Sequence, residues 1–294
     1  MGLEYIHHEF APRNVIPARL WERFLGFSDH FEDYASMCVD RKLETLGENN
    51  YLSGGCVEYL PCLTVVQVPK MNEKDINEVN STMNRLMTEN PQCNTVFQLT
   101  TDQHFNWKSP KIHDFLVQSY ADARKKYPIN CYFSPSVLNI IVHIRRGDVD
   151  SRPDTLARYT SNEDYVSIIK KLLYLLEDLD YKNVLGREDY EIHLYSEGKP
   201  EDFGDIQNLP NTQFHLNDDL FETMHHMRNA DILVGSFSAF SAYARTFMKG
   251  IPIFPAIQVE TEGVPFKDGD FKEEHFEYWW DQRKDAIKSN KCDN

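Results

Sequence analysis

The chain has 294 residues and a formal net charge of −15, with 41% hydrophobic and 13% aromatic residues. This length suits one large domain or two of ordinary size, and this composition excludes a disordered chain. The acidic balance excludes a general nucleic-acid binder, because such proteins carry basic surfaces; one local basic pocket for a phosphate remains compatible with it.

Targeting signals and cysteines give the first expectation about the compartment. Met1–Phe10 lacks the apolar core of a signal peptide, and no apolar run approaches the roughly 20 residues of a membrane helix. The six cysteines include no C-x-x-C pair, so we expect free thiols in a reducing compartment, with a disulfide framework as the alternative. The chain is therefore expected to be cytoplasmic, without an integral membrane segment. A luminal catalytic domain separated from its anchor is the alternative.

The N-terminal part predicts alternating helices and short strands. Gly26 opens a loop, and Ser28 or Asp29 can cap a helix that ends near Leu46, before Gly47. A glycine loop that opens a helix places free backbone N–H groups near a ligand. Hydrophobic periodicity then predicts further elements: strands over 64–68 and 96–99, and helices over 72–89 and 112–126.

The stretch from Leu138 to Asp150 organises the second half. Its β-branched apolar run predicts a strand that is buried on both faces of a parallel sheet. The strand ends in Arg145, Arg146 and Gly147, and ligands of open α/β sheets bind at this edge. Because a guanidinium matches two phosphate oxygens at once, the residues predict a diphosphate site. Since neighbouring side chains of a strand point to opposite faces, one arginine should hold the diphosphate and the other pair with an acid inside the fold.

The later elements predict a Rossmann-like unit, because strands and helices alternate from residue 138 onward. Ser161 begins a plausible capping box for the helix that follows. The expected helices cover 165–179, 218–228, 238–248 and 271–288, and the expected strands cover 191–195, 231–235 and 251–254, the last being the final strand.

Three pieces of this half resemble one family. His143-Ile144-Arg145-Arg146-Gly147-Asp148 is similar to the H-x-R-R-G-D motif of α1,2-, α1,6- and O-fucosyltransferases, Leu194–Gly198 to their short strand ending in Ser-Asp, and Ala230–Ser241 to their S-x-S-S-F-S motif. The loop at Gly26 resembles, more weakly, their G-x-G-N-Q loop, with Ser28, Asp29 and His30 in place of Asn and Gln.

The resemblance implies an α/β protein of the GT-B type, with two Rossmann-like domains facing across a cleft. It implies an N-terminal acceptor-side domain over 1–130, a donor-binding domain over 131–270, and a terminal helix over 271–294 that packs back across the seam. It further implies an inverting, metal-independent glycosyltransferase that moves fucose from GDP-fucose to a glycan hydroxyl, without a cofactor beyond this co-substrate. A UDP-sugar donor such as UDP-xylose, or a non-catalytic nucleotide- or glycan-binding protein, is the alternative.

The expected site joins both halves. The residues expected to bind the donor are His143, Arg145, Arg146, Ser196, Glu197, Ser236, Ser238, Ala239, Phe240 and Ser241. Hydroxyl residues at a helix N-terminus suit a phosphate, whereas His143 is divided between a donor contact and a core histidine. The acceptor-side loop is expected to contain Gly26, Ser28 and His30.

A base must take the proton of the acceptor hydroxyl. Asp29 is the first candidate, with a helix cap as its structural alternative, and Asp148, Asp150 and Asp154 are the candidates of the second domain. Asp148-Val149-Asp150 also spells the D-x-D motif of metal-dependent glycosyltransferases, but the neighbouring arginines would repel a cation. No metal site is therefore expected, and the oligomeric state stays open.

Overall fold

The structure, a computed structural model, describes residues 64–68, 81, 85, 88–89, 95–99, 110–258 and 263–290. The chain divides into two compact units, residues 1–123 and 124–294. The expected domain boundary, 130/131, lies a few residues beyond this division. The roles assigned to the domains stay predictions.

The described part of the first unit contains two paired strands. β1 (Thr64–Val68) and β2 (Thr95–Leu99) are parallel and in register, as β-branched residues in both strands favour. Residues 81, 85, 88 and 89 are helical. α4 (Pro110–Lys126) ends in three basic residues, which suit a helix C-terminus. These elements agree with the predicted strands and helices, whereas the helix predicted from Ser28 or Asp29 to Leu46 lies outside the described residues.

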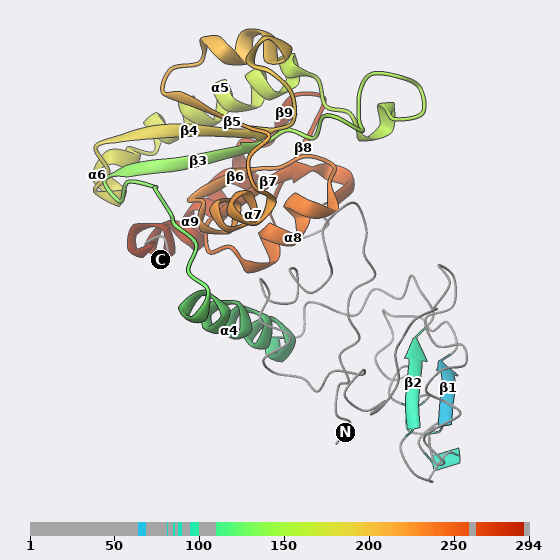
Figure 1. Ribbon diagram of the computed structural model, residues 1–294. Helices are drawn as coiled ribbons and strands as arrows, with labels where there is room; N and C mark the ends of the chain where they lie inside the picture. The colour runs from blue at the N-terminus through green and yellow to red at the C-terminus, as the bar shows by residue number, and fades with distance from the viewer. Residues whose placement is uncertain are drawn as a thin grey trace. The chain divides into compact units, whose positions relative to one another are not determined.

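The second unit is built on one seven-stranded sheet (Figure 1). Its strands are β3 (Val137–His143), β4 (Asp189–Ser196), β5 (Thr212–Leu216), β6 (Ile232–Val234), β7 (Ile251–Pro255), β8 (Val264–Lys267) and β9 (Asp270–Phe271). Their order is β5-β4-β3-β6-β7-β8-β9, and all neighbours are parallel except β8 and β9. The α/β class is thereby confirmed.

The connections between these strands are helical. They contain the α-helices α5 (Asn162–Asp178), α6 (Tyr181–Leu185), α7 (Leu220–Asn229) and α8 (Ala239–Phe247), and α9 (Glu273–Ser289) follows the sheet; the 3₁₀ helices are η2 (Leu156–Arg158), η3 (Pro200–Asn208) and η4 (Ala256–Gln258). With β3 first, the six parallel strands follow the order 3-2-1-4-5-6 of the Rossmann fold. The strand order reverses between β3 and β6, because the chain adds β4 and β5 on one side of β3 and then β6, β7 and β8 on the other. Ligands of such sheets bind at this position.

Alternation along β3 separates the two layers of helices. Leu138, Ile140 and Val142 belong to the apolar cluster that includes the buried side of α5. The opposite face carries Ile141 and His143 and is covered by α7 and α8 (Figure 1). Because both faces are covered, β3 is buried from Leu138 to His143, as its continuous apolar run predicts.

Helix α5 begins where its sequence predicts. Ser161 is the N-cap, and its side chain accepts a hydrogen bond from the backbone N of Asp164 at 3.0 Å. Six buried side chains recur at helical spacing along the helix and face the sheet. The capping signal at Ser161 therefore predicted the start of α5, and the amphipathic pattern predicted its buried side.

The sheet extends beyond its predicted last strand, 251–254, so that prediction was wrong. β7 is not the final strand, because β8 pairs with it and β9 pairs with β8. The main contacts of α9 join it to α6, β7 and β8, all in the second unit. Its return to the N-terminal domain, and the facing of two Rossmann-like domains across a cleft, stay predictions.

Candidate functional site

The candidate site lies at the carboxyl ends of β3, β4 and β6. β3 pairs with β4 on one side and with β6 on the other, so the segments that leave these strands meet at one edge. Ser196 Oγ donates to the backbone O of Ile144 at 2.6 Å and joins the exits of β4 and β3. The fold thus brings the three motifs of the second half together.

Gly147 makes the sharp turn after β3. Its φ of +80° lies in the left-handed region that glycine adopts without strain. A Cβ atom at this position would also overlap the carboxylate of Glu197. The backbone conformation therefore requires the glycine, and the exposed Glu197 side chain would have to move aside for any larger residue.

Arg145 connects the turn after β3 with the start of α8. Its Nη1 donates to the backbone O of Phe237 at 3.1 Å, directly before the N-cap residue of α8. Its Nε and Nη2 form a bidentate pair with Asp148, at 2.9 and 2.6 Å. This pair raises the pKa of Arg145 and lowers that of Asp148. The carboxylate thus occupies the fork that a phosphate would use.

Arg146 points to a different environment. Its Nη2 donates to Asn162 Oδ1 at 2.8 Å and to the backbone O of Thr160 at 3.1 Å, and the guanidinium lies 4.6 Å from the centre of the Tyr159 ring. Its Nη1 donates to the backbone O of Arg145. Burial lowers the pKa of Arg146. The hydrogen-bond acceptors of Arg146 are neutral oxygens, whereas Arg145 has the acid partner. Arg146 holds the turn against the start of α5.

His143 is buried beneath the site. Its Nδ1 lies 2.9 Å from Ser236 Oγ, and its ring centre lies 5.6 Å from that of Phe240. Burial, and secondarily the charge of Arg145, lower the pKa of His143 to about 4. The neutral imidazole of His143 joins β3 to the segment that follows β6. This contact is the one expected of a core histidine, and direct contact with a donor stays a prediction.

The start of α8 is stabilised by a residue that the sequence analysis missed. Ser238 is the N-cap and accepts from the backbone N of Phe240 at 3.2 Å. With its amide oriented to satisfy both partners, Gln258 donates to the backbone O of Ser236 at 2.8 Å and accepts from the backbone N of Ser238 at 3.0 Å. Gln258 follows β7. The only sequence signal for its role was that it lies shortly after the carboxyl end of a predicted strand.

The remaining expected donor residues lie at the same edge with different exposure. Ser241 is buried and its Oγ lies 3.4 Å from the backbone O of Ser236, whereas Ala239 is exposed and Phe240 half-buried. Glu197 is exposed beside Gly147. Their contact with a donor stays a prediction.

The acidic D-x-D triplet is engaged in ion pairs. Asp148 pairs with Arg145, and Asp150 pairs with Arg152 at 2.8 Å. Among the described residues, no cluster of three His, Cys, Asp or Glu side chains is placed to hold a metal ion. The four expected residues of the first loop, Gly26, Ser28, Asp29 and His30, lie outside the described residues.

Cys131 corrects the expectation of free thiols. It is disulfide-bonded, and its partner lies outside the described residues. Within the part of the chain that is described, no helix combines the length and the apolar character needed to cross a membrane.

The solved structures that resemble this chain include three of POFUT1, an O-fucosyltransferase. The complex with GDP is 13% identical, with coverage of 64% of this chain and 70% of that chain and a TM-score of 0.27. The apo form has 15% identity, coverage of 61% and 60%, and a TM-score of 0.31. The complex with GDP-fucose has 13% identity, coverage of 61% and 58%, and a TM-score of 0.30. The chain thus spans less than two thirds of the length of the latter two.

No protein-family model matches the sequence, and no curated protein matches it. The likeness to POFUT1 is too weak to carry an argument about function.

Proposed function

We propose that this chain is a glycosyltransferase that moves a sugar from a nucleotide-sugar donor to a hydroxyl of a glycan. One observation carries the proposal: Arg145 at the end of the central strand donates to Phe237 O, and this contact places its guanidinium at the N-terminus of α8. A guanidinium and a helix N-terminus at the reversal point of a Rossmann sheet suit a diphosphate.

The described side chains suggest how the donor phosphates would be held. Arg145 supplies the charge, and the first turn of α8 supplies backbone N–H groups and a favourable dipole. Ser236 and His143 support this turn from below. Stabilisation of the leaving diphosphate by these groups supports a metal-independent reaction, and the similarity of His143–Asp148 to the fucosyltransferase motif favours GDP-fucose as the donor.

The candidate bases remain the carboxylates named from the sequence. Asp148 is a weak base while Arg145 holds its pKa low. A diphosphate that takes the fork of Arg145 would release Asp148, so donor binding itself would make this carboxylate available to the acceptor. Asp29 on the other unit is the second candidate, and Asp150 and Asp154 are the remaining ones. Inversion follows if the base acts on the face opposite the leaving diphosphate.

The disulfide of Cys131 favours the luminal alternative over a cytoplasmic location. Disulfides persist in oxidising compartments and are rare in the cytosol. Such a compartment suits an enzyme that acts on glycans.

A thermal-shift panel tests the proposal. The ligands are GDP, UDP, GDP-fucose, UDP-xylose, UDP-glucose and UDP-N-acetylglucosamine, each with EDTA. A nucleotide at 100 times its Kd should stabilise the protein by about 2.7 kcal/mol. We expect GDP and GDP-fucose to shift the melting temperature in EDTA. A shift with UDP ligands alone would instead identify a UDP-sugar donor, and no shift with any of them would overturn the proposal.

Turnover distinguishes the enzyme from a non-catalytic binding protein on the same fold. With the preferred labelled donor, an enzyme releases free sugar or transfers it to a glycan, whereas a binding protein leaves the donor intact. The first-loop residues Ser28 and Asp29, which differ from the family pattern, keep the binding protein as the second candidate.

Asp148→Asn is expected to tighten GDP binding by about two- to fivefold, because it removes the anion that competes for Arg145. The Asp148 side chain is 61% exposed, and a pair this exposed contributes at most about 1 kcal/mol. If Asp148 is the base, the same variant should lower the transfer rate at least roughly 100-fold. Titration calorimetry and a transfer assay measure the two effects. Asp150→Asn, which alters the pair with Arg152, should leave GDP affinity unchanged. Weaker GDP binding by Asp148→Asn would contradict the competition.

A further inference from the structure

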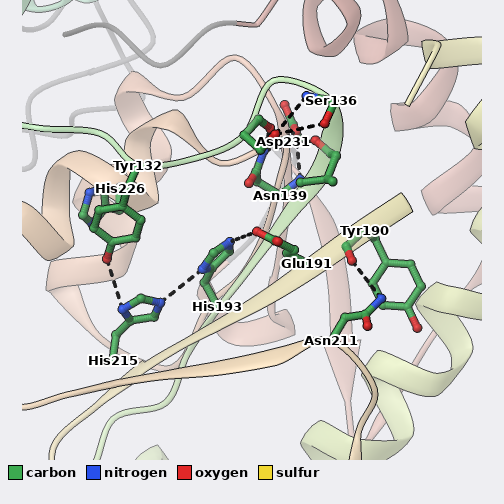
Figure 2. Close-up of polar contacts among 12 residues, drawn as sticks. Tyr132, Ser136, Asn139, Tyr190, Glu191, His193, Asn211, His215, His226 and Asp231 are labelled. Carbon is green, nitrogen blue, oxygen red and sulfur yellow. Dashed lines mark hydrogen bonds and ion pairs between the residues drawn. The ribbon is translucent and has the colours of Figure 1, made fainter. Parts of the chain in front are cut away.

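Three histidines and two tyrosines form one continuous row of hydrogen bonds on the sheet face that α7 covers. Figure 2 shows the part of the row that runs from Tyr132 through His215 to His193. We call this row the histidine–tyrosine relay. It runs from the backbone O of Asn130 through His226, Tyr195, Tyr132 and His215 to His193, with successive separations of 3.2, 2.9, 2.9, 3.0 and 3.1 Å. None of its residues was predicted to be functional.

The relay fastens the segment that connects α4 to β3, residues 127–136. Asn130 and Tyr132 belong to this connecting segment, whereas the other members come from β4, β5 and α7. The ring of Tyr132 stacks on that of His215, with centroids 5.5 Å apart. Phe133 packs against His193, with centroids 4.8 Å apart. The contacts of the segment with β4, β5 and α7 are thus made largely with titratable side chains, and Cys131 in the same segment adds a disulfide bond.

The direction of the relay follows from its fixed end. A carbonyl oxygen only accepts, so His226 must donate to Asn130 from Nε2. In a neutral imidazole the other nitrogen then accepts, and Nδ1 of His226 takes the proton of Tyr195. With its single proton used, Tyr195 accepts from Tyr132.

The same argument fixes the remaining protons. Because Tyr132 donates to Tyr195, it must accept from Nδ1–H of His215. Asp218 Oδ2, which lies 3.5 Å from this nitrogen, favours a proton there. The Nε2 of His215 is then an acceptor, and His193 donates to it from Nδ1. All five hydrogen bonds therefore point the same way, which strengthens each of them.

The relay ends at an unprotonated nitrogen, Nε2 of His193. Nε2 of His193 is buried without a hydrogen-bond partner, and Oε2 of Glu191 lies 3.5 Å away (Figure 2). Burial lowers the pKa of His193 to about 3 and that of His226 to about 4, and it lowers that of His215 against the pull of Asp218. All three histidines are therefore neutral at pH 7, as the assignment of protons requires.

The relay can accept one proton but not two. A proton on Nε2 of His193 faces Glu191 and leaves every other hydrogen bond in place. A second proton, on His215 or His226, would put a donor against a donor, because every acceptor in the row is already used. Asp218 and Glu222 are the other charged groups beside the row; burial raises the pKa of Tyr132, and the charges of these two carboxylates raise it further. They attract a further proton but offer no new position within the row.

We propose that the relay is an acid-sensitive latch: it holds the connecting segment on β4, β5 and α7 at neutral pH, and it releases the segment as the histidines become protonated. The proposal does not depend on the function proposed above. Release of the segment would free His215 and His226 to take up protons at their ordinary pKa of about 6.5. For each histidine freed, the population of the open form rises about tenfold between pH 7.5 and pH 5.5.

Imidazole nitrogen NMR at pH 7.5 tests the arrangement of protons. We expect the Nε2–H tautomer for His226 and the Nδ1–H tautomer, which is the rarer one in free histidine, for His193 and His215. A different tautomer at any of the three would overturn the relay.

Hydrogen exchange of the full chain tests the latch. After correction for intrinsic rates, exchange in residues 127–136 should rise at least about tenfold from pH 7.5 to pH 5.5, while β3 stays protected. His226→Gln keeps a donor and an acceptor but cannot be protonated, so it should lose about a tenfold part of this response. His225→Gln, at the neighbouring position and outside the row, should keep it. An unchanged segment, or equal exchange in the segment and β3, would overturn the latch.

The tautomer measurement keeps the test decisive if either variant fails to fold, because it uses the unmodified protein. Tyr195→Phe gives a second variant, since it removes one hydroxyl from the middle of the row. It should raise exchange of the connecting segment already at pH 7.5, and unchanged exchange in a folded variant would contradict the latch.

Discussion

Arg145→Ala is expected to lower sugar transfer at least roughly 100-fold and to remove the thermal shift that the preferred nucleotide causes. The guanidinium lies at the end of the central strand, contacts the turn that opens α8, and carries the charge that this turn lacks. Its loss removes a bidentate partner of the diphosphate, which backbone N–H groups do not replace. Arg145→Lys keeps the charge but not the planar fork, so its transfer rate should lie between that of the wild type and that of Arg145→Ala.

Arg145→Ala should lower the free energy of unfolding by at most about 2 kcal/mol, because it loses the ion pair with Asp148 and the hydrogen bond to Phe237 O. The ion pair that the variant loses is on the surface, with 25% of the Arg145 side chain and 61% of the Asp148 side chain exposed. Such pairs contribute at most about 1 kcal/mol to the free energy of unfolding. Loss of nucleotide binding could therefore not be attributed to unfolding.

Arg146→Ala is the matched control. It should lower the stability of the protein more than Arg145→Ala does, and it should affect nucleotide binding less. This side chain donates to Thr160, Asn162 and the backbone of Arg145 from a half-buried position. Its removal leaves these oxygens without a donor and should lower the free energy of unfolding by roughly 2–4 kcal/mol. Calorimetry and a transfer assay on both variants give the comparison. A site in which Arg146, and not Arg145, controls nucleotide affinity would contradict the assignment.

The two arginines show how far the sequence leads. The apolar run before them predicted a buried central strand, and Gly147 predicted the turn, because both depend on local chemistry. The different roles of the arginines depend on what stands opposite each of them. Phe237 lies 92 residues from Arg145, and no local pattern indicates this contact.

The edges of the sheet were harder to predict than its centre. β5 and β9 lie at the two edges, and β8 contains Pro265, which a central strand rarely tolerates. Short edge strands are only partly buried, so their sequences lack the continuous apolar run that revealed β3. Strong periodicity predicted α5 well for the same reason, since burial imposes the pattern.

The histidine–tyrosine relay left one signal in the sequence. His193 and Tyr195 alternate with the apolar residues Ile192 and Leu194 along β4, a pattern that places two polar aromatic groups on one face of a buried strand. The partners of this face come from three other segments, and only the register of the strands brings them together. The pattern could have revealed a polar layer, but not the direction of its hydrogen bonds.

The other large effect is expected at the amino ends of the strands, opposite the candidate site, where Asp231 precedes β6. Its Oδ2 accepts from the backbone N of Asn139 at 3.0 Å, and its Oδ1 accepts from Asn290 at 3.0 Å. Arg187 Nη2 lies 3.9 Å away and also donates to Ile287 in α9. Burial raises the pKa of Asp231, against these donors. One buried carboxylate thus joins β3, β6 and the end of α9.

Asp231→Ala should lower the free energy of unfolding by roughly 3–5 kcal/mol, because it leaves the buried Arg187 without its ion-pair partner and two amide donors without their acceptor. For a unit of this size the melting temperature should fall by about 10 °C. The matched control is Asp270→Ala, which removes a carboxylate 69% exposed and paired with Lys171 at the surface, and which should cost less than about 1 kcal/mol. Calorimetry of both variants measures the difference. Equal small effects would mean that Asp231 is replaceable, and that apolar packing alone holds α9 to the sheet.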